Sequence, residues 1–136
     1  MKRIEFIVEA GRRDSSGDII LLRGIRNPND KVPLLREFDT SKSLGSATLK
    51  LGDVLRATAD IEDEHLDLVP AIHYEIGKDD YEYNAEEYTT TIKRCRIHSV
   101  GLCMKPNSDK QILSLRDQLM TGQAKEITGL RKLFAK

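Results

Sequence analysis

Apolar and polar residues alternate along much of the first two thirds of the chain, the pattern of half-buried β-strands. In residues 4–10, Ile4, Phe6, Val8 and Ala10 alternate with Glu5, Ile7 and Glu9, which predicts the first strand. The short apolar run within 18–26 predicts a strand buried on both faces. Residues 32–38 predict an edge strand, because Pro33 has no N–H to donate to a β-ladder. The start of the chain is therefore predicted to be mainly β-structure.

The longest alternating pattern covers residues 47–76 and predicts two strands joined by a tight turn at Asp63 and Glu64, or by a slightly longer loop with the same pairing. With that turn, Ile61 would face Leu66, and the pairs before them would also fall on one apolar face. A slip of one residue would turn one strand's apolar side chains to the wrong face, so this register is preferred. The sequence thus predicts an antiparallel hairpin, with a bulge at Gly52 in its first strand.

Residues 77–87 predict an acidic loop, and residues 88–104 predict the last long strand, because they are rich in β-branched side chains. The apolar positions change parity within 88–104, which predicts a bulge near His98 and Ser99. The predicted strands therefore end with an irregular one.

Helical patterns follow. Ser108 and Gln111 have the spacing of a capping box and precede an apolar stripe, so they predict the start of a helix. That helix is predicted to end at Thr121 and Gly122. A second helix is predicted over 124–136, with its apolar residues on one face.

These elements predict an α+β protein dominated by antiparallel sheet. The expected architecture is a small, partly open barrel or curled sheet of five to six strands, followed by two C-terminal helices. At 136 residues the chain is expected to be a single domain, with a β part at 1–104 and a helical segment at 105–136 packed on it. The sequence contains no apolar run long enough to cross a bilayer, so no membrane span or membrane partner is expected.

Charge is sorted by position, although the formal net charge is zero. Residues 1–57 carry 11 basic and 8 acidic side chains, 58–88 carry 1 and 11, and 89–136 carry 10 and 3. Concentrating the acidic residues in the middle block costs self-repulsion, unless a basic segment or partner covers them. This sorting indicates association rather than chemistry.

In the predicted hairpin, Asp60 would oppose Asp67, and like charges directly across a sheet are destabilising. The main functional hypothesis is therefore a non-catalytic interaction or assembly protein, which self-associates as a homo-oligomer or docks on a protein partner. Its acidic surface (60–87) would meet a basic surface (93–136). The predicted partner-binding residues are Asp60, Glu62, Asp63, Glu64, Asp67, Asp79, Asp80 and Glu82.

The alternative hypothesis is a small β-barrel that binds single-stranded nucleic acid or a nucleotide-like anion. Basic side chains beside an aromatic one are typical of such surfaces, because bases stack on aromatic rings while cations contact the phosphates. The residues predicted for this role are Tyr88, Lys93, Arg94, Arg96 and Lys105.

Sequence motifs of catalysis are absent: the chain has no phosphate-binding glycine loop, no GxSxG and no HExxH. Cys95, His98 and Cys103 resemble zinc ligands in spacing, but a fourth ligand is missing locally and a regular strand would separate the cysteines. We therefore expect no enzymatic activity, no cofactor and no bound metal. Two cysteines without a secretory signal predict reduced thiols and a cytoplasmic location.

Overall fold

The computed structural model describes residues 1–8, 17–104, 115–122 and 124–127. Its larger sheet contains β1 (Lys2–Val8), β3 (Lys31–Arg36), β4 (Ser43–Leu51), β5 (Leu55–Ile61), β6 (Val69–Glu75), β9 (Arg96–Cys103) and β10 (Lys125–Ile127). A smaller sheet contains β2 (Asp18–Ile20), β7 (Tyr81–Asn84) and β8 (Thr89–Ile92). Two 3₁₀ turns, η1 (Leu22–Gly24) and η2 (Asp63–His65), and the helix α1 (Leu115–Thr121) complete the described elements.

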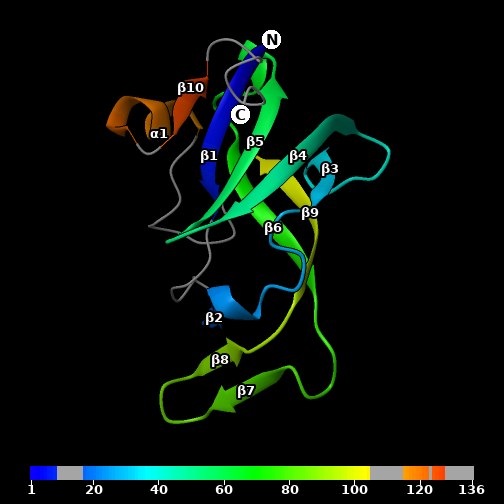
Figure 1. The fold of residues 1–136 in the computed structure, drawn as a ribbon, viewed down its shortest axis with the longest axis vertical. Helices are drawn as coiled ribbons and strands as arrows, with labels where there is room; N and C mark the ends of the chain where they lie inside the picture. The colour runs from blue at the N-terminus through cyan, green and yellow to red at the C-terminus, as the bar shows by residue number, and fades with distance from the viewer. Residues whose placement is uncertain (9–16, 105–114, 123, 128–136) are drawn as a thin grey trace.

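The larger sheet is curled. Six of its strands follow the order β1-β5-β4-β3-β9-β6 and form a half-barrel, and β10 adds to the outer edge of β1. The first and last of the six, β1 and β6, come into contact. Neighbours are antiparallel except β3 and β9, which are parallel. The small sheet lies below the half-barrel (Figure 1), with β2 parallel to β8 and β7 antiparallel to it. The expected mostly antiparallel, curled sheet is confirmed.

The core of the half-barrel follows the alternation of the sequence. On β1, Ile4, Phe6 and Val8 are buried, and the side chains between them are only half-buried. Alternate residues of β5, from Leu55 to Ile61, are buried in the same way. Because successive side chains of a strand point to opposite faces, one face of each strand supplies the core and the other faces solvent.

The predicted hairpin between 47–61 and 66–76 is wrong. β5 pairs with β1 and β4, and β6 pairs with β9 instead. Gly52 lies in the turn between β4 and β5, where its N–H donates to the Val54 carbonyl at 3.1 Å, rather than in a bulge. The first strand buries most of its predicted parity of residues, whereas the second does so only from Leu66 to Pro70, since Ile72 and Tyr74 are half-buried and Ile76 is exposed. The predicted parity is satisfied equally well against other apolar strands.

Three other strand predictions also differ. Only 18–20 of the predicted strand 18–26 is β-structure, and the chain then turns through η1. The acidic loop 77–87 contains β7, and the long strand 88–104 is divided into β8 and β9 in different sheets. The segment 32–38 contributes β3, which lies inside the sheet between β4 and β9 rather than at its edge. Pro33 is tolerated there because β9 pairs with β3 only from Leu34 onward.

The predicted bulge is confirmed. His73 pairs with Ser99 and Tyr74 pairs with Ile97, so His98 is the additional residue on β9.

The C-terminal prediction holds only in part. The helix ends at Thr121, before Gly122 with a φ of 80°, as predicted. In place of the start of a second helix, residues 125–127 form β10 against β1. The capping box at 108–111 and the end of the second helix lie outside the described residues. Within the described ranges, no helix has the length and apolar character required to cross a membrane.

Candidate functional site

Two segments distant in the sequence lie side by side at the junction of the two sheets. Ile25 and Cys95 form a parallel bridge. The Cys95 N–H donates to the Gly24 carbonyl at 3.0 Å, and the Arg26 N–H donates to the Cys95 carbonyl at 2.8 Å. The Ile25 and Cys95 side chains are buried, whereas Arg26, Arg94 and Arg96 are exposed. The bridge therefore places three arginines on one outer surface.

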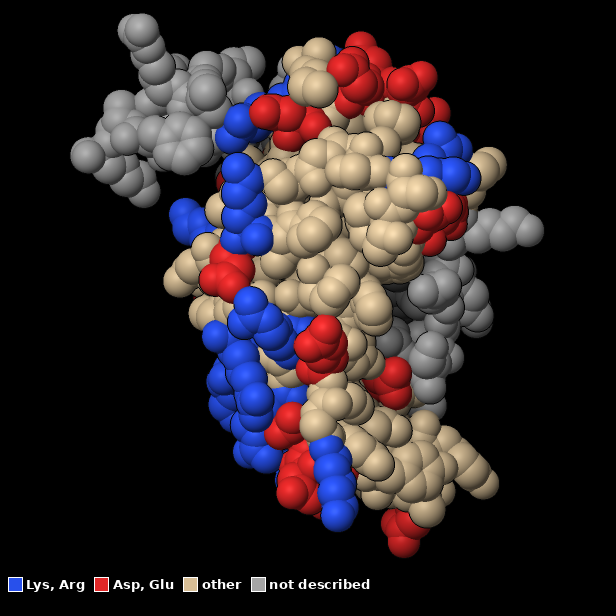
Figure 2. Space-filling view, turned by 90° about the vertical axis from the view of Figure 1, so that its right-hand side faces the viewer, with Lys and Arg blue, Asp and Glu red and all other residues tan. Residues whose placement is uncertain are grey.

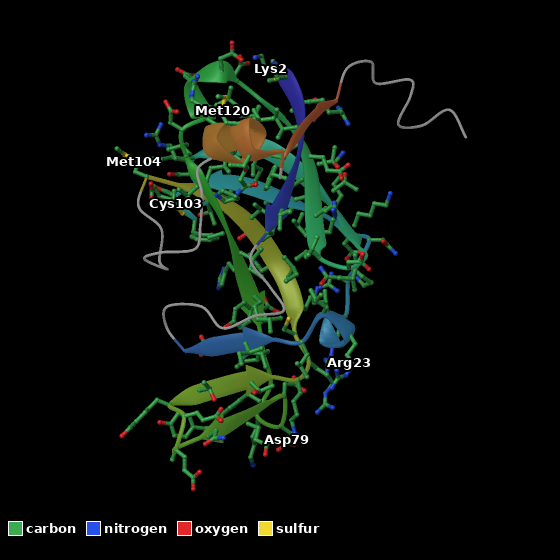
Figure 3. The ribbon with its side chains drawn as sticks, turned by 90° about the vertical axis from the view of Figure 1, so that its left-hand side faces the viewer. Lys2, Arg23, Asp79, Cys103, Met104 and Met120 are labelled. Carbon is green, nitrogen blue, oxygen red and sulfur yellow. The ribbon has the colours of Figure 1, made fainter. Side chains whose placement is uncertain are left out.

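Gly24 allows this close approach. A Cβ added at Gly24 would lie 1.8 Å from the carbonyl oxygen of Lys93 and 3.1 Å from the Cα of Arg94. Any other side chain would push the two segments apart. Gly24 is also the last residue of η1, which carries the exposed Arg23 next to the same surface. Figure 3 shows Arg23 beside the small sheet, below the half-barrel.

Asp80 fixes the guanidinium groups of this junction. Its Oδ1 accepts from Arg94 Nε at 2.9 Å and from Arg26 Nη2 at 3.4 Å, and its Oδ2 accepts from the Gly77 N–H at 2.8 Å. The side chain of Asp80 is only 11% exposed. Its hydrogen bond with Arg94, followed by that with Gly77, holds the pKa of this carboxyl below its ordinary value. Asp80 is therefore an anion that positions two arginines.

The basic surface continues onto the half-barrel. Arg96 pairs with Asp30 at 3.4 Å, and the Asp30 carbonyl accepts from the N–H of Leu49 on β4 at 2.8 Å. Beside Leu49 lies an open hollow of about 320 Å³, whose lining includes Arg3 and Lys50. Lys50 pairs in register with Arg56 of β5. Basic side chains thus extend from the small sheet to the outer face of β1, β5 and β4.

We call this surface the basic belt. It comprises Arg3, Arg23, Arg26, Lys31, Lys50, Arg56, Arg94 and Arg96. Four carboxylates pair with its members: Asp60 with Arg3, Glu5 with Arg56, Asp30 with Arg96, and Asp80 with both Arg26 and Arg94. Counting the ion-paired carboxylates alone, eight cations against four anions leave a surplus of four positive charges, and Glu75 is a further acidic neighbour across from Arg96. Figure 2 shows Lys and Arg side chains gathered in a band down the left-hand side of the view, with acidic side chains between them.

The predicted acidic surface is divided between the two ends of the molecule. Around η2, at the top of Figure 1, lie Asp60, Glu62, Asp63, Glu64 and Asp67. At the bottom, Asp79 and Asp80 precede β7 of the small sheet, and Glu82 lies on β7. The expected opposition of Asp60 and Asp67 is wrong, because Asp60 lies across from Arg3 of β1.

Cations of the same chain accompany the acidic residues around η2. The Asp60 carboxylate accepts two hydrogen bonds from Arg3, at 2.9 and 2.8 Å, and Asp67 accepts one from Arg116 of α1 at 2.6 Å. The remaining contacts are longer: Asp63 with Lys2 at 3.8 Å, Glu62 with the amino group of Met1 at 3.8 Å, and Glu64 with His65 at 3.6 Å. Basic groups therefore do cover this part of the acidic surface. They come mainly from β1 and the chain start, rather than from the predicted segment 93–136.

The predicted nucleic-acid-binding residues are brought together only in part. Arg94 and Arg96 belong to the basic belt, and Lys93 lies between the junction and β8. Tyr88 stands before β8 and is separated from Arg94 by the length of that strand. Tyr81 is the tyrosine nearer to the belt, because it follows Asp80 and pairs with Ile92 at the other end of β8. Lys105 lies outside the described residues.

Sequence reasoning missed Arg23 and Arg26. The signal was present: two arginines flank Gly24 and the apolar Ile25 in RGIR. In such a pattern the glycine allows a second segment to approach, the apolar residue is buried in the bridge, and the flanking arginines point to solvent. The partner of that bridge, Cys95, lies far along the chain, so the local sequence could not identify it.

The two cysteines do not supply a nucleophile at neutral pH. Burial raises the pKa of the Cys95 thiol and of the Cys103 thiol to about 11. Both therefore remain protonated and pack as small apolar side chains. The groups of the basic belt are cations and their counter-ions.

Comparison of the chain with protein-family models, curated proteins and solved structures gave no match. The function of the chain is therefore inferred from the charge and geometry of the basic belt.

Proposed function

We propose that the chain is a non-catalytic binding protein whose basic belt docks single-stranded nucleic acid. The observation that carries the proposal is the surplus of four positive charges along one continuous surface. Phosphate contacts with Lys and Arg supply most of the affinity of sequence-independent nucleic-acid binding, because they release condensed counterions.

The composition of the belt also supports a phosphate ligand. Six of its eight residues are arginines, whose planar guanidinium groups match phosphate oxygens in pairs. Arg26 and Arg94 are held by Asp80, so less side-chain freedom is lost when a phosphate arrives. Tyr81, 47% exposed, follows Asp80 and offers a ring on which an unpaired base can stack. A single strand is the form whose bases are free to do so.

The experiment is fluorescence anisotropy with a labelled thymidine oligonucleotide at salt concentrations from about 50 to 200 mM. If four phosphates are neutralised, log K falls against log salt with a slope of about −3. Arg94→Ala with Arg96→Ala should weaken binding at least tenfold at the lowest salt and reduce the slope by about 1.4. Arg23→Ala with Lys50→Ala should weaken binding and reduce the slope to the same extent. This second variant breaks no ion pair, because neither side chain pairs with any described residue.

A matched control removes two charges elsewhere. Lys42→Ala with Arg116→Ala lowers the net charge equally, but lies on the β3–β4 loop and on α1, outside the belt. It should change the dissociation constant by less than about threefold. Binding that is independent of salt, or equal losses for belt and control variants, would overturn the proposal.

A second candidate function, self-association, is favoured by the β7–β8 hairpin. All residues from 81 to 88 are exposed, including three tyrosines. Glu82, Glu86 and Glu87 make no ion pair with any described residue, and β7 has one unpaired edge within the described sheet. Tyrosine is enriched at protein interfaces, and this acidic hairpin is complementary in charge to the basic belt of a second copy.

Sedimentation velocity without nucleic acid tests self-association. Particles larger than a monomer should shrink as salt rises, and Glu82→Gln with Glu86→Gln should shrink them at low salt. A monomer at every ionic strength would exclude this second function and leave the first unaffected.

A further inference from the structure

Two exposed histidines meet on neighbouring strands of the half-barrel, and His98 is two residues from Arg96 of the basic belt on β9. His73 lies on β6 and His98 on β9, at the bulge where the register of these two strands shifts. Their ring centroids are 5.1 Å apart and the ring planes are inclined by 54°. The rings are therefore neighbours but not stacked. Bulges commonly re-aim a side chain, and they are frequent next to functional sites.

A second irregularity adjoins the pair. Glu37 and Phe38 follow each other with φ values of 53° and 58°, in the left-handed region that costs energy for residues other than glycine. This conformation brings the Phe38 ring edge-on to His73, with ring centroids 6.1 Å apart. Strained backbone that persists in a fold is concentrated at binding and catalytic sites.

Gly101 accommodates this ring. A Cβ added there would lie 2.6 Å from the Phe38 ring, so the ring occupies the place of a side chain on β9. The additional residue of the bulge and this glycine lie on β9, and the two left-handed residues lie just after β3. All of them surround one pair of imidazoles.

The separation of the rings suits a shared metal ion. Imidazole nitrogens bind Zn²⁺ at about 2.0–2.1 Å, and two imidazoles on one tetrahedral ion therefore have ring centroids about 5 Å apart. The observed 5.1 Å agrees with this value. We propose that His73 and His98 bind a divalent transition ion of the imidazole-preferring class, Zn²⁺, Ni²⁺ or Cu²⁺. Mg²⁺ and Ca²⁺ are excluded from the class because they require oxygen ligands.

The proposed site is open. Among the described residues, no group of three or more His, Cys, Asp and Glu side chains could hold an ion, so the described chain supplies two ligands. The remaining positions are available to water or to an anionic ligand. Since β6 is the edge strand of the sheet, the ion would also link this edge to β9.

The test is isothermal titration of Zn²⁺ and Ni²⁺ into protein without a histidine tag at about pH 7.5. We expect one ion per chain, and at least a tenfold loss of affinity in His73→Gln and in His98→Gln. Cu²⁺ provides a second measurement, because its electron paramagnetic resonance spectrum should show two coupled nitrogens that fall to one in either variant.

The chain offers a matched control in its third histidine. His65 lies on η2 and is not part of the pair, so His65→Gln should bind the ion as the parent protein does. Circular dichroism of each variant establishes that it is folded before titration. Unchanged binding after loss of both His73 and His98, an equal loss in His65→Gln, or no heat of binding up to millimolar Zn²⁺ would each overturn the proposal.

Discussion

The half-barrel and the small sheet are stabilised in different ways. Phe6, Leu55 and Val100 of the half-barrel are completely buried, whereas every residue of β7 is exposed. The small sheet is connected to the rest of the molecule by Ile20 and Ile92, which are buried in the common core, by the Ile25–Cys95 bridge and by the hydrogen bonds of Asp80. Apolar burial stabilises the half-barrel and also anchors β2 and β8 to its core, whereas β7 contributes no buried side chain.

Phe6→Ala provides the strongest test of this difference. It removes a fully buried ring from β1, so the free energy of unfolding should fall by about 3–5 kcal/mol, measured by urea denaturation. Tyr83→Ala on β7 removes an aromatic ring that is 57% exposed, and should change the free energy of unfolding by less than about 0.5 kcal/mol. Similar losses in the two variants would mean that the exposed strand β7 contributes as much to stability as the buried strand β1.

Asp80→Asn tests the polar attachment alone. Amide hydrogen exchange in β7 and β8 should become severalfold faster, while exchange in β1 and β5 stays unchanged. Because the pKa of Asp80 is lowered in the fold, its contribution is present well above pH 3.8 and is lost as the pH falls through the lowered value. The difference in protection between parent and variant should therefore shrink as the pH is lowered from about 6 to about 2.5. A difference that persists at the lower pH would contradict the role of the ionised carboxylate.

The smallest expected effect belongs to the exposed ion pairs around η2. Asp60→Asn with Asp67→Asn should lower the free energy of unfolding by about 0–1 kcal/mol for each pair, because each carboxylate loses an arginine partner. The loss should decrease at high salt, as denaturation at about 0.05 and about 0.5 M NaCl would reveal. A gain in stability would instead indicate that repulsion among the acidic residues outweighs their pairing with Arg3 and Arg116.

The sequence predicted which side of several strands is buried, but not which strands are neighbours. Leu55 and Ile61 are buried as their alternation indicates, yet β5 pairs with β1, at the very start of the chain. Alternation specifies a face and leaves the partner open whenever several strands offer equivalent apolar faces. The residues of the turn at 62–65 did not indicate whether the strands on its two sides pair with each other, because they contain neither Asn-Gly nor Asp-Gly, the usual hairpin turns.

The candidate site was predictable to the extent that it is local. Arg94 and Arg96 were recognised because they share a face of one segment, on either side of the buried Cys95. The other half of the junction, Arg23 and Arg26, is brought there by a bridge between distant segments. Asp80 was assigned to an acidic docking surface, since its pairing with two arginines depends on the same long-range contact.

The parallel pairing of β3 with β9 has a consequence for synthesis on the ribosome. Leu34 lies opposite Val100, so the second neighbour of β3 is made only after most of the intervening strands. At about 5–20 residues per second, the nascent chain waits on the order of seconds before this strand is enclosed. During that interval its free hydrogen-bonding groups are exposed to other polypeptides, which makes the growing chain, more than the finished protein, the species most in need of a chaperone.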